Sequence, residues 1–281
     1  MPELPEVETV RRGLNRVTLN YPIRGGDVLL TRTIDHPIFV GDFLTALVGA
    51  EIVEWQRRGK YLLAALARSG QSAGWLGVHL RMTGQLLWVS PDEPVSSHCR
   101  VRLFLGENHE LRYVDQRTFG RLWWVPPEVE PPSIMTGLQR LGPEPFDSAF
   151  SVDYLRHAFR GRQRPIKNAL LDQRLVAGIG NIYADEALFL SGIRPKTISG
   201  QLGPARLRRL HGAILKALTT SIDAGGTTFS DFRDVHGVNG NYGGVAWVYD
   251  RDGEPCRVCG TEIKRLKLAG RSAHYCPQCQ R

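Results

Sequence analysis

Hydrophobic residues recur along this chain with two different periods, and the change of period divides the chain into blocks. Val7, Val10 and Leu14 follow a helical spacing and predict a helix over residues 6–15. From about residue 27 to residue 125, short apolar runs are separated by Gly, Pro, Asp or Asn, which predicts strands. The strands expected from this pattern are Glu51–Trp55, Tyr61–Leu66, Leu86–Val89, Val101–Leu105, Leu111–Tyr113 and Leu122–Val125. Short strands at regular intervals are typical of a β-sandwich.

The second half of the chain has helical periodicity after a clear break. Six prolines lie between Pro126 and Pro145, which indicates an interdomain linker. Helical spacing then runs from Val152 to about Asp223, and a glycine-rich stretch from residue 225 to 244 follows. We therefore expect an α+β multidomain protein with an N-terminal β-sandwich and a helical part after it.

Length, composition and charge narrow the class of protein. The 281 residues, 42% of them hydrophobic, suffice for two domains with separate cores. No apolar run is long enough to span a membrane, and the N-terminus lacks the pattern of a secretion signal. The formal net charge is +8, which favours a polyanionic partner such as nucleic acid.

Four cysteines near the C-terminus form two Cys-x2-Cys pairs, Cys256 with Cys259 and Cys276 with Cys279. This spacing is typical of zinc ribbons and zinc hairpins. Four thiolates complete a tetrahedron, so we expect one structural Zn²⁺ per chain with no open position for a substrate. Two disulfides or a redox dithiol are the alternatives. The remaining Cys99 is expected to be a free thiol.

The cysteine segment is also basic. Residues 251–281 hold seven Lys or Arg against three acidic residues. A zinc hairpin would present these cations on one rigid loop, which suits a phosphate backbone. The cations on or between the two cysteine pairs are Arg257, Lys264, Arg265, Lys267 and Arg271.

The N-terminus carries candidate covalent chemistry. If Met1 is removed, Pro2 supplies a free secondary amine, followed closely by the carboxylates of Glu3 and Glu6. Such an amine can attack a sugar carbon and form a Schiff base. A proline after the initiator, or at the start of a helix, is the alternative explanation.

A glycine turn in the helical block predicts an anion site. Pro165 suits the first turn of a helix through Leu171, and residues 177–181 then form a tight turn with Asn181 as the expected N-cap of the next helix. Backbone N–H groups at such a turn point towards an anion, and a DNA phosphate is the natural candidate.

These motifs together resemble bacterial formamidopyrimidine-DNA glycosylase. The resemblance extends from the first residue to the last and keeps the order of the motifs. The chain has Met82, Arg117 and Phe119 with the PELPE opening, which favours this type over the related endonuclease VIII type. The motifs are the opening PELPEVE, residues 58–61, 79–84, 115–120 and 178–183, and the terminal cysteine pairs.

The resemblance implies a fold and a set of boundaries. It implies a catalytic β-sandwich domain over residues 1–130, a linker over 131–150 and a helix–two-turn–helix DNA-binding domain over 151–225. A lesion-recognition loop region over 226–250 and a zinc finger over 251–281 complete the chain.

The resemblance also implies a reaction. The enzyme would be a bifunctional DNA glycosylase and abasic-site lyase that excises oxidised purines, notably 8-oxoguanine and formamidopyrimidines, and cuts the strand by β,δ-elimination. Pro2 would be the nucleophile, and Glu3 would protonate the opening sugar. Lys60 would contact phosphate and assist elimination, and Arg271 would grip the flanking phosphate and donate a proton in the second elimination.

DNA contacts follow from the same resemblance. An enzyme that acts on a base must extrude it, and Met82, Arg117 and Phe119 would fill the resulting gap. Glu6 would belong to the floor of the base pocket or to its hydrogen-bond network. Arg117 would also bind DNA, through the orphaned partner base, and further contacts to the DNA backbone are assigned to His79, His98, Arg162, Lys167 and Asn181.

The chain departs from the family pattern in two loops. Gln116 and Thr118 stand where the family pattern has proline and a basic residue, which puts the shape of the Phe119 loop in question. The lesion-recognition stretch around residues 230–246 has no residue-by-residue match, although Thr227 and Thr228 are candidates to touch the flipped base.

A second class of function remains open at this point. A zinc-dependent protein that binds damaged DNA without cutting it would share the basic hairpin and the glycine turn, but it would not need Pro2, Glu3 or Lys60. In either case we expect damaged double-stranded DNA as the partner, no membrane, a monomer, and a bacterial cytoplasmic location at the nucleoid.

Overall fold

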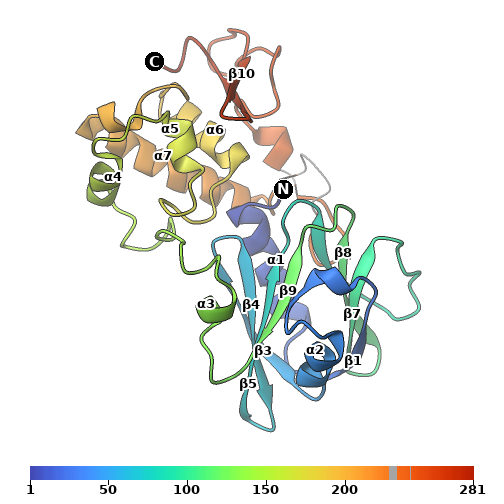
Figure 1. The fold of residues 1–281 in the computed structure, drawn as a ribbon. Coiled ribbons are helices and arrows are strands. Elements are labelled where there is room, and N and C mark those ends of the chain that lie inside the picture. Colours follow the sequence, from blue (N-terminus) through green and yellow to red (C-terminus); the bar gives the residue numbers. More distant parts are fainter. Residues whose placement is uncertain (228–232, 241) are drawn as a thin grey trace. The chain divides into compact units, whose positions relative to one another are not determined.

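The computed structural model describes residues 1–227, 233–240 and 242–281 (Figure 1). The chain divides into two compact units. The first comprises Met1–Gln139 with Gly225–Gly240, and the second comprises Arg140–Ala224 with Asn241–Arg281. The glycine-rich stretch after the last long helix is therefore shared between the two units.

The first unit is a β-sandwich of two mostly antiparallel sheets. One sheet has the order β1-β7-β8-β6 and the other β2-β9-β5-β4-β3, in which β2 and β9 run parallel. Helix α1 (Leu4–Val17), helix α2 (Val40–Leu47) and the short α3 (Pro131–Ile134) accompany the sheets. The strands are β1 (Ile23–Val28), β2 (Ile34–His36), β3 (Glu51–Arg58), β4 (Tyr61–Arg68), β5 (Gln71–His79), β6 (Gly84–Val89), β7 (Cys99–Leu105), β8 (His109–Asp115) and β9 (Arg121–Val125).

Helix α1 is fixed to the sandwich by both packing and hydrogen bonds. Its apolar side chains Val7, Val10 and Leu14 are fully buried in the core of this unit. The buried indole of Trp55 on β3 donates to the Thr18 hydroxyl at 2.9 Å. The side chain of Asn15 bonds both the N–H and the carbonyl of Trp55, at 2.8 and 2.9 Å. The start of α1 is therefore held in a fixed place relative to the sheet.

The second unit consists of helices followed by a small hairpin. Helix α6 is buried along most of its length and packs against α7 and β11, so it forms the centre of this unit. The elements are α4 (Val152–Phe159), α5 (Ile166–Leu170), α6 (Asn181–Leu190), α7 (Pro204–Asp223), β10 (Lys264–Leu268) and β11 (Arg271–Tyr275).

The fold class predicted from the sequence is confirmed, but the element assignment was incomplete. The predicted helix over 6–15 is α1, and the six predicted strands are β3, β4, β6, β7, β8 and β9. Strands β1, β2 and β5 and helices α2 and α3 were missed. Strand β5 is central and buried on both faces over most of its length, so it shows no alternation of polar and apolar residues.

Candidate active site and nucleic-acid interface

The proposed catalytic N-terminus begins helix α1. Glu3 is its N-cap and forms a reciprocal capping box with Glu6, whose Oε2 accepts from the Glu3 N–H at 2.8 Å. Pro2, Glu3 and Glu6 are all buried. The other oxygen of Glu6 accepts from the backbone N–H of Thr227 at 3.0 Å. Glu6 thus fixes both the start of α1 and the first part of the glycine-rich stretch.

Lys60 lies in the tight turn between β3 and β4. Gly59 precedes it with φ of 57°, a left-handed conformation that glycine adopts readily. The Lys60 side chain is largely buried. The guanidinium of Arg57 donates to the Gly59 carbonyl at 3.1 Å and to Glu8 on α1 at 3.2 Å. The turn that carries Lys60 is therefore tied to the helix that follows Pro2.

Glu8 links helix α1 to the turn that carries Lys60. Its carboxylate forms ion pairs with Arg11, Arg12 and Arg57 at 2.7–3.2 Å. Burial disfavours its charged form, but hydrogen bonds from Arg11 and Arg12 and the charges of Arg11 and Arg57 outweigh burial and lower the pKa of Glu8 to about 2. Glu8 therefore stays ionised at any pH at which the protein is expected to work.

His79, a predicted DNA contact, is held without a charge. Burial, together with the positive charges of Arg81 and Lys60, lowers its pKa to about 3. Its Nδ1 accepts from the Arg81 N–H at 3.0 Å, and its ring meets Tyr61 edge-on at 4.4 Å between centroids. A neutral imidazole can still donate through Nε2, but it brings no positive charge to a phosphate.

The predicted gap-filling residues lie on two loops that share hydrogen bonds. Asp115, at the end of β8, accepts from the Thr83 hydroxyl at 2.5 Å and from the Gly120 N–H at 2.8 Å. The Thr83 oxygen in turn accepts from the Arg117 N–H at 3.0 Å. This network joins the turn of Met82 to the loop of Arg117 and Phe119.

The loop between β8 and β9 presents an exposed aromatic side chain. Phe119 is 50% exposed, as expected for a loop residue and unlike a core phenylalanine. The guanidinium of Arg117 lies over its ring, 5.0 Å from the centroid. Thr118 adopts φ of 57°, and its hydroxyl accepts a hydrogen bond from the guanidinium of Arg32. The residue that departs from the family pattern at this position is therefore held by a hydrogen bond.

His98 lies in a polar pocket of this unit. The pocket has a volume of about 390 Å³ and is lined in part by Thr83, Gln116, Arg233 and Asn239. His98 therefore opens onto the same space as Thr83, next to Met82, and Gln116, next to Arg117. The predicted base contact of Thr228 lies outside the described residues, whereas Thr227 is buried.

The glycine turn of the second unit is built by a glutamine. Gln173 accepts from the Gly178 N–H at 2.9 Å and donates to the Ile179 carbonyl at 2.6 Å. Contrary to the expected N-cap at Asn181, the N-cap of α6 is Gly180, and Asn181 is the first helical residue. Its amide donates to the Ser272 hydroxyl on β11 at 3.2 Å, which connects the start of α6 with the hairpin.

Lys167 occupies a different place from the one its predicted role requires. Its side chain is fully buried, and its ammonium contacts Asp185 at 2.6 Å and the Ser272 carbonyl at 2.5 Å. A lysine held in this way does not offer its charge to a phosphate at the surface. Of the predicted phosphate contacts in this unit, Arg162 and Arg271 are exposed, and Lys167 instead supports the strand that carries Arg271.

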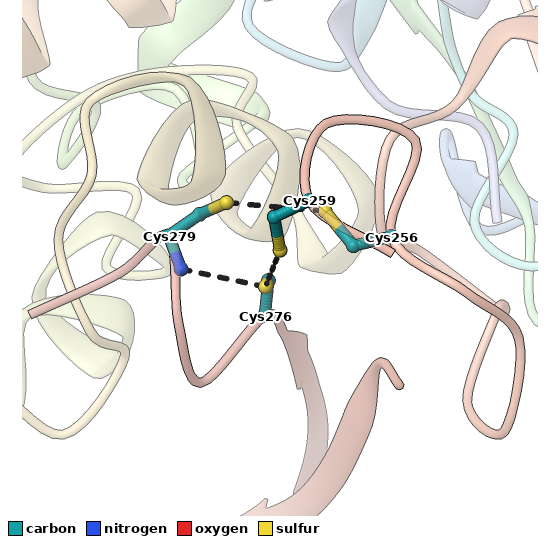
Figure 2. Close-up of side chains that lie close together, drawn as sticks. All are labelled: Cys256, Cys259, Cys276 and Cys279. Atoms are coloured by element: carbon teal, nitrogen blue, oxygen red, sulfur yellow. Dashed lines mark hydrogen bonds between the residues drawn. The ribbon is translucent and has the colours of Figure 1, made fainter. Parts of the chain in front are cut away.

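The four C-terminal cysteines converge as a zinc site requires (Figure 2). The sulfur atoms of Cys259 and Cys276 are 3.5 Å apart, and those of Cys256 and Cys279 are 3.9 Å apart. Zn–S bonds of about 2.3 Å place tetrahedral sulfurs about 3.8 Å apart. A disulfide needs about 2.05 Å, so the alternative of two disulfides does not fit. The donor set suits a structural zinc.

The turn of the β10–β11 hairpin presents Arg271. Ala269 and Gly270 form a two-residue turn, and both have positive φ, of 45° and 81°. Two-residue hairpin turns of this kind match the twist of the strands they join.

Among the described residues, none of the helices combines the length and apolar character needed to cross a bilayer.

Comparison with known proteins identifies the class. Residues 1–122 match the family described as "Formamidopyrimidine-DNA glycosylase N-terminal domain". Residues 141–233 match the "Formamidopyrimidine-DNA glycosylase H2TH domain", and residues 253–281 match the "Zinc finger found in FPG and IleRS". The protein is therefore a DNA glycosylase for oxidised bases.

Proteins similar to this chain over its whole length belong to the same family. The formamidopyrimidine-DNA glycosylase of Acaryochloris marina is 63% identical over 281 residues, covering 100% of this chain and 99% of the relative. That of a Nostoc species is 61% identical over 282 residues, with 100% of both chains covered. The chain belongs to the formamidopyrimidine-DNA glycosylase family, as its motifs predict.

Solved structures of similar proteins include complexes with damaged DNA. A Lactococcus lactis enzyme variant in complex with Fapy-dG DNA has a TM-score of 0.90 and 33% identity, with 100% of both chains covered. A MutM complex with carbocyclic 8-oxo-G DNA has a TM-score of 0.89 and 34% identity, again over 100% of both chains. The Thermus thermophilus enzyme has a TM-score of 0.86 and 38% identity, covering 99% of this chain and 98% of that one.

Proposed function

We propose that the protein excises oxidised purines, 8-oxoguanine and formamidopyrimidines, through a Schiff base on Pro2 and then cuts the strand. The observation that carries this proposal is the buried start of α1, where Pro2 directly precedes the reciprocal pair of Glu3 and Glu6. Similar enzymes crystallised with Fapy-dG DNA and with carbocyclic 8-oxo-G DNA support the choice of substrate.

The chemistry begins once Met1 has been removed. The Pro2 nitrogen attacks the sugar C1′ and gives up its proton, the bond from C1′ to the base breaks, and the base leaves with the bonding electrons and takes up a proton. Glu3 delivers a proton to the ring oxygen as the sugar opens, and the Pro2 nitrogen becomes an iminium. The iminium acidifies the sugar C2′ proton, so the 3′ phosphate leaves by β-elimination. A second elimination releases the 5′ phosphate.

Cations on both units assist these steps. Lys60 contacts phosphate and aids elimination, and its turn is held to α1 through Arg57 and Glu8. Arg271 grips the phosphate beside the lesion and donates the proton of the second elimination. Arg162 and Asn181 bind the DNA backbone in the second unit. His79, as a neutral donor, and His98 bind it in the first.

Base extrusion requires that the gap in the duplex be filled. Met82 and Phe119 insert as apolar side chains, and Arg117 hydrogen-bonds the orphaned partner base. The hydrogen bonds through Asp115 and Thr83 hold the two loops together, so these side chains act as one wedge. One Zn²⁺ at the four cysteines stiffens the hairpin that carries Arg271. The protein acts as a monomer on the bacterial nucleoid in the cytoplasm.

Borohydride trapping on a duplex with one 8-oxoguanine tests this proposal. We expect a covalent adduct that maps to Pro2 in protein lacking Met1, and much less adduct with Pro2→Gly. The intact mass of the free protein shows whether Met1 has been removed and the Pro2 amine is free. The Lys60→Ala variant should still form the trapped adduct but should cut the strand slowly. Zinc-dependent binding without any adduct, with the Pro2 amine free, would instead favour a damage-binding protein.

A further inference from the structure

Three potential metal ligands converge next to the cysteine site. Asp250 and Asp252 precede the first cysteine pair, and His274 lies on β11. Their ligand atoms all lie within 4.8 Å of one another. Both aspartates are exposed, whereas His274 is 2% exposed. The group therefore combines one buried nitrogen with two carboxylates at the surface.

The orientation of the His274 ring is set by a buried carboxylate. The Oδ2 atom of Asp185 lies 3.2 Å from His274 Nδ1 and accepts from the His274 N–H at 3.0 Å. The other Asp185 oxygen contacts the buried ammonium of Lys167. This contact with Asp185 leaves the Nε2 edge of the ring turned towards Asp252. Metal-binding histidines are commonly held by a carboxylate in this way.

The Nε2 atom is buried and has no hydrogen-bond partner among the described residues. It faces Asp252, whose Oδ1 lies 3.6 Å away. That separation is too long for a hydrogen bond. Two ligand atoms of a tetrahedral ion lie about 3.3 Å apart when each bond to the ion is about 2.0–2.1 Å long. The separation of Nε2 and Oδ1 is close to that value. A metal ion at this position would give the buried Nε2 atom a partner.

We propose that Asp250, Asp252 and His274 form a second divalent-metal site, with Zn²⁺ as the best-matched ion and water as a fourth ligand. One imidazole and two carboxylates are a donor set that suits Zn²⁺ and, among divalent ions, binds it well. The chain would then bind one zinc ion at the four cysteines and a second ion at this site. The second ion joins the segment before Cys256 to β11, the strand that carries Arg271.

Metal stoichiometry of the full-length protein tests the proposal. Protein with one Zn²⁺ per chain at the cysteines is titrated with further Zn²⁺ by calorimetry, and metal content is measured after equilibrium dialysis. We expect a second equivalent, weakened at least about tenfold by Asp250→Asn or Asp252→Asn. The matched control is Glu262→Gln, because Glu262 is also exposed in this segment and pairs with Lys264, as Asp252 does with Arg265, but it is not a member of the ligand group. It should leave the second equivalent unchanged.

Cobalt distinguishes the two sites. Protein holding zinc at the cysteines should take up one Co²⁺ with weak visible bands and no sulfur-to-cobalt charge transfer. These bands should be absent in the aspartate variants, which change only exposed side chains and preserve the fold. Failure of the wild type to take up a second equivalent would overturn the proposal. A second equivalent that persists unchanged in both aspartate variants would overturn it equally.

Discussion

Replacing Glu186 with glutamine should destabilise the second unit strongly, although the shape of the side chain is preserved. Glu186 is fully buried on α6. One of its oxygens accepts from the N–H groups of Val248 and Tyr249 at 2.9 and 3.0 Å. The other accepts from the Trp247 N–H at 2.8 Å and the Tyr242 hydroxyl at 3.1 Å. This carboxylate therefore holds the segment that leads into the zinc finger.

The expected magnitude follows from counting these donors. A glutamine amide keeps one accepting oxygen and turns an N–H₂ group towards the other two donors. Each buried donor that loses its acceptor costs about 1–3 kcal/mol, so Glu186→Gln should lower the free energy of unfolding by roughly 2–6 kcal/mol. Because the affected segment leads to Cys256, the variant should also release zinc faster to a competing chelator.

Urea denaturation followed by circular dichroism measures the stability, and a colorimetric chelator measures zinc release. Glu262→Gln makes the same chemical change at an exposed side chain and should shift stability by less than about 0.5 kcal/mol. If Glu186→Gln lost less than about 1 kcal/mol and kept its zinc as the wild type does, the four hydrogen bonds would not be holding this segment.

Three further predictions concern buried charges and one tight contact. Lys167→Met should cost about 3–5 kcal/mol by thermal melting because Asp185 is left buried without its cation, and adding Asp185→Asn should recover part of the loss; no recovery would argue against the pair. The pKa of Glu8 is about 2 in the folded protein against 4.5 in the reference state, so its stabilisation is full above pH 4.5 and is lost as pH falls towards 2. Glu8→Gln should therefore lose about 2 kcal/mol near neutral pH, after allowance for solvent screening, and less at pH 3; an equal loss at both values would contradict this. Gly120→Ala should cost about 1–3 kcal/mol because the new Cβ would lie 1.6 Å from the Tyr113 hydroxyl, and Tyr113→Phe should relieve part of that cost.

Local sequence patterns were sufficient to predict many of the helices and strands, but not all of them. Helix α1 was predictable because Val7, Val10 and Leu14 lie on one face of a helix. Strand β5 was not, because a strand covered on both sides carries apolar residues at consecutive positions. Its Gly77 illustrates the same limit: a Cβ there would lie 2.4 Å from the sulfur of Met135, a contact that only the fold creates.

Site residues divide in the same way. The cysteine pairs were predictable because each pair is close in sequence and only four thiolates are needed to bind the ion. Lys167 was expected at a phosphate from the family resemblance, yet its ammonium is buried against Asp185. Nothing in the sequence pairs His274 with Asp250 and Asp252, since neither spacing nor composition shows which side chains meet across a hairpin.

Short motifs were enough to show the family and the α+β architecture, and to indicate four cysteines as metal ligands and Pro2 as the nucleophile that we propose, because the chemistry of such motifs is local. Tertiary structure alone decided which charges are buried and what they contact. Glu8 became a hub for three arginines, Lys167 an internal ion pair, and His274 a ring with one nitrogen held by Asp185. The physical reason is that desolvation and hydrogen-bond partners depend on residues far apart in the chain, and those contacts form only when the elements pack.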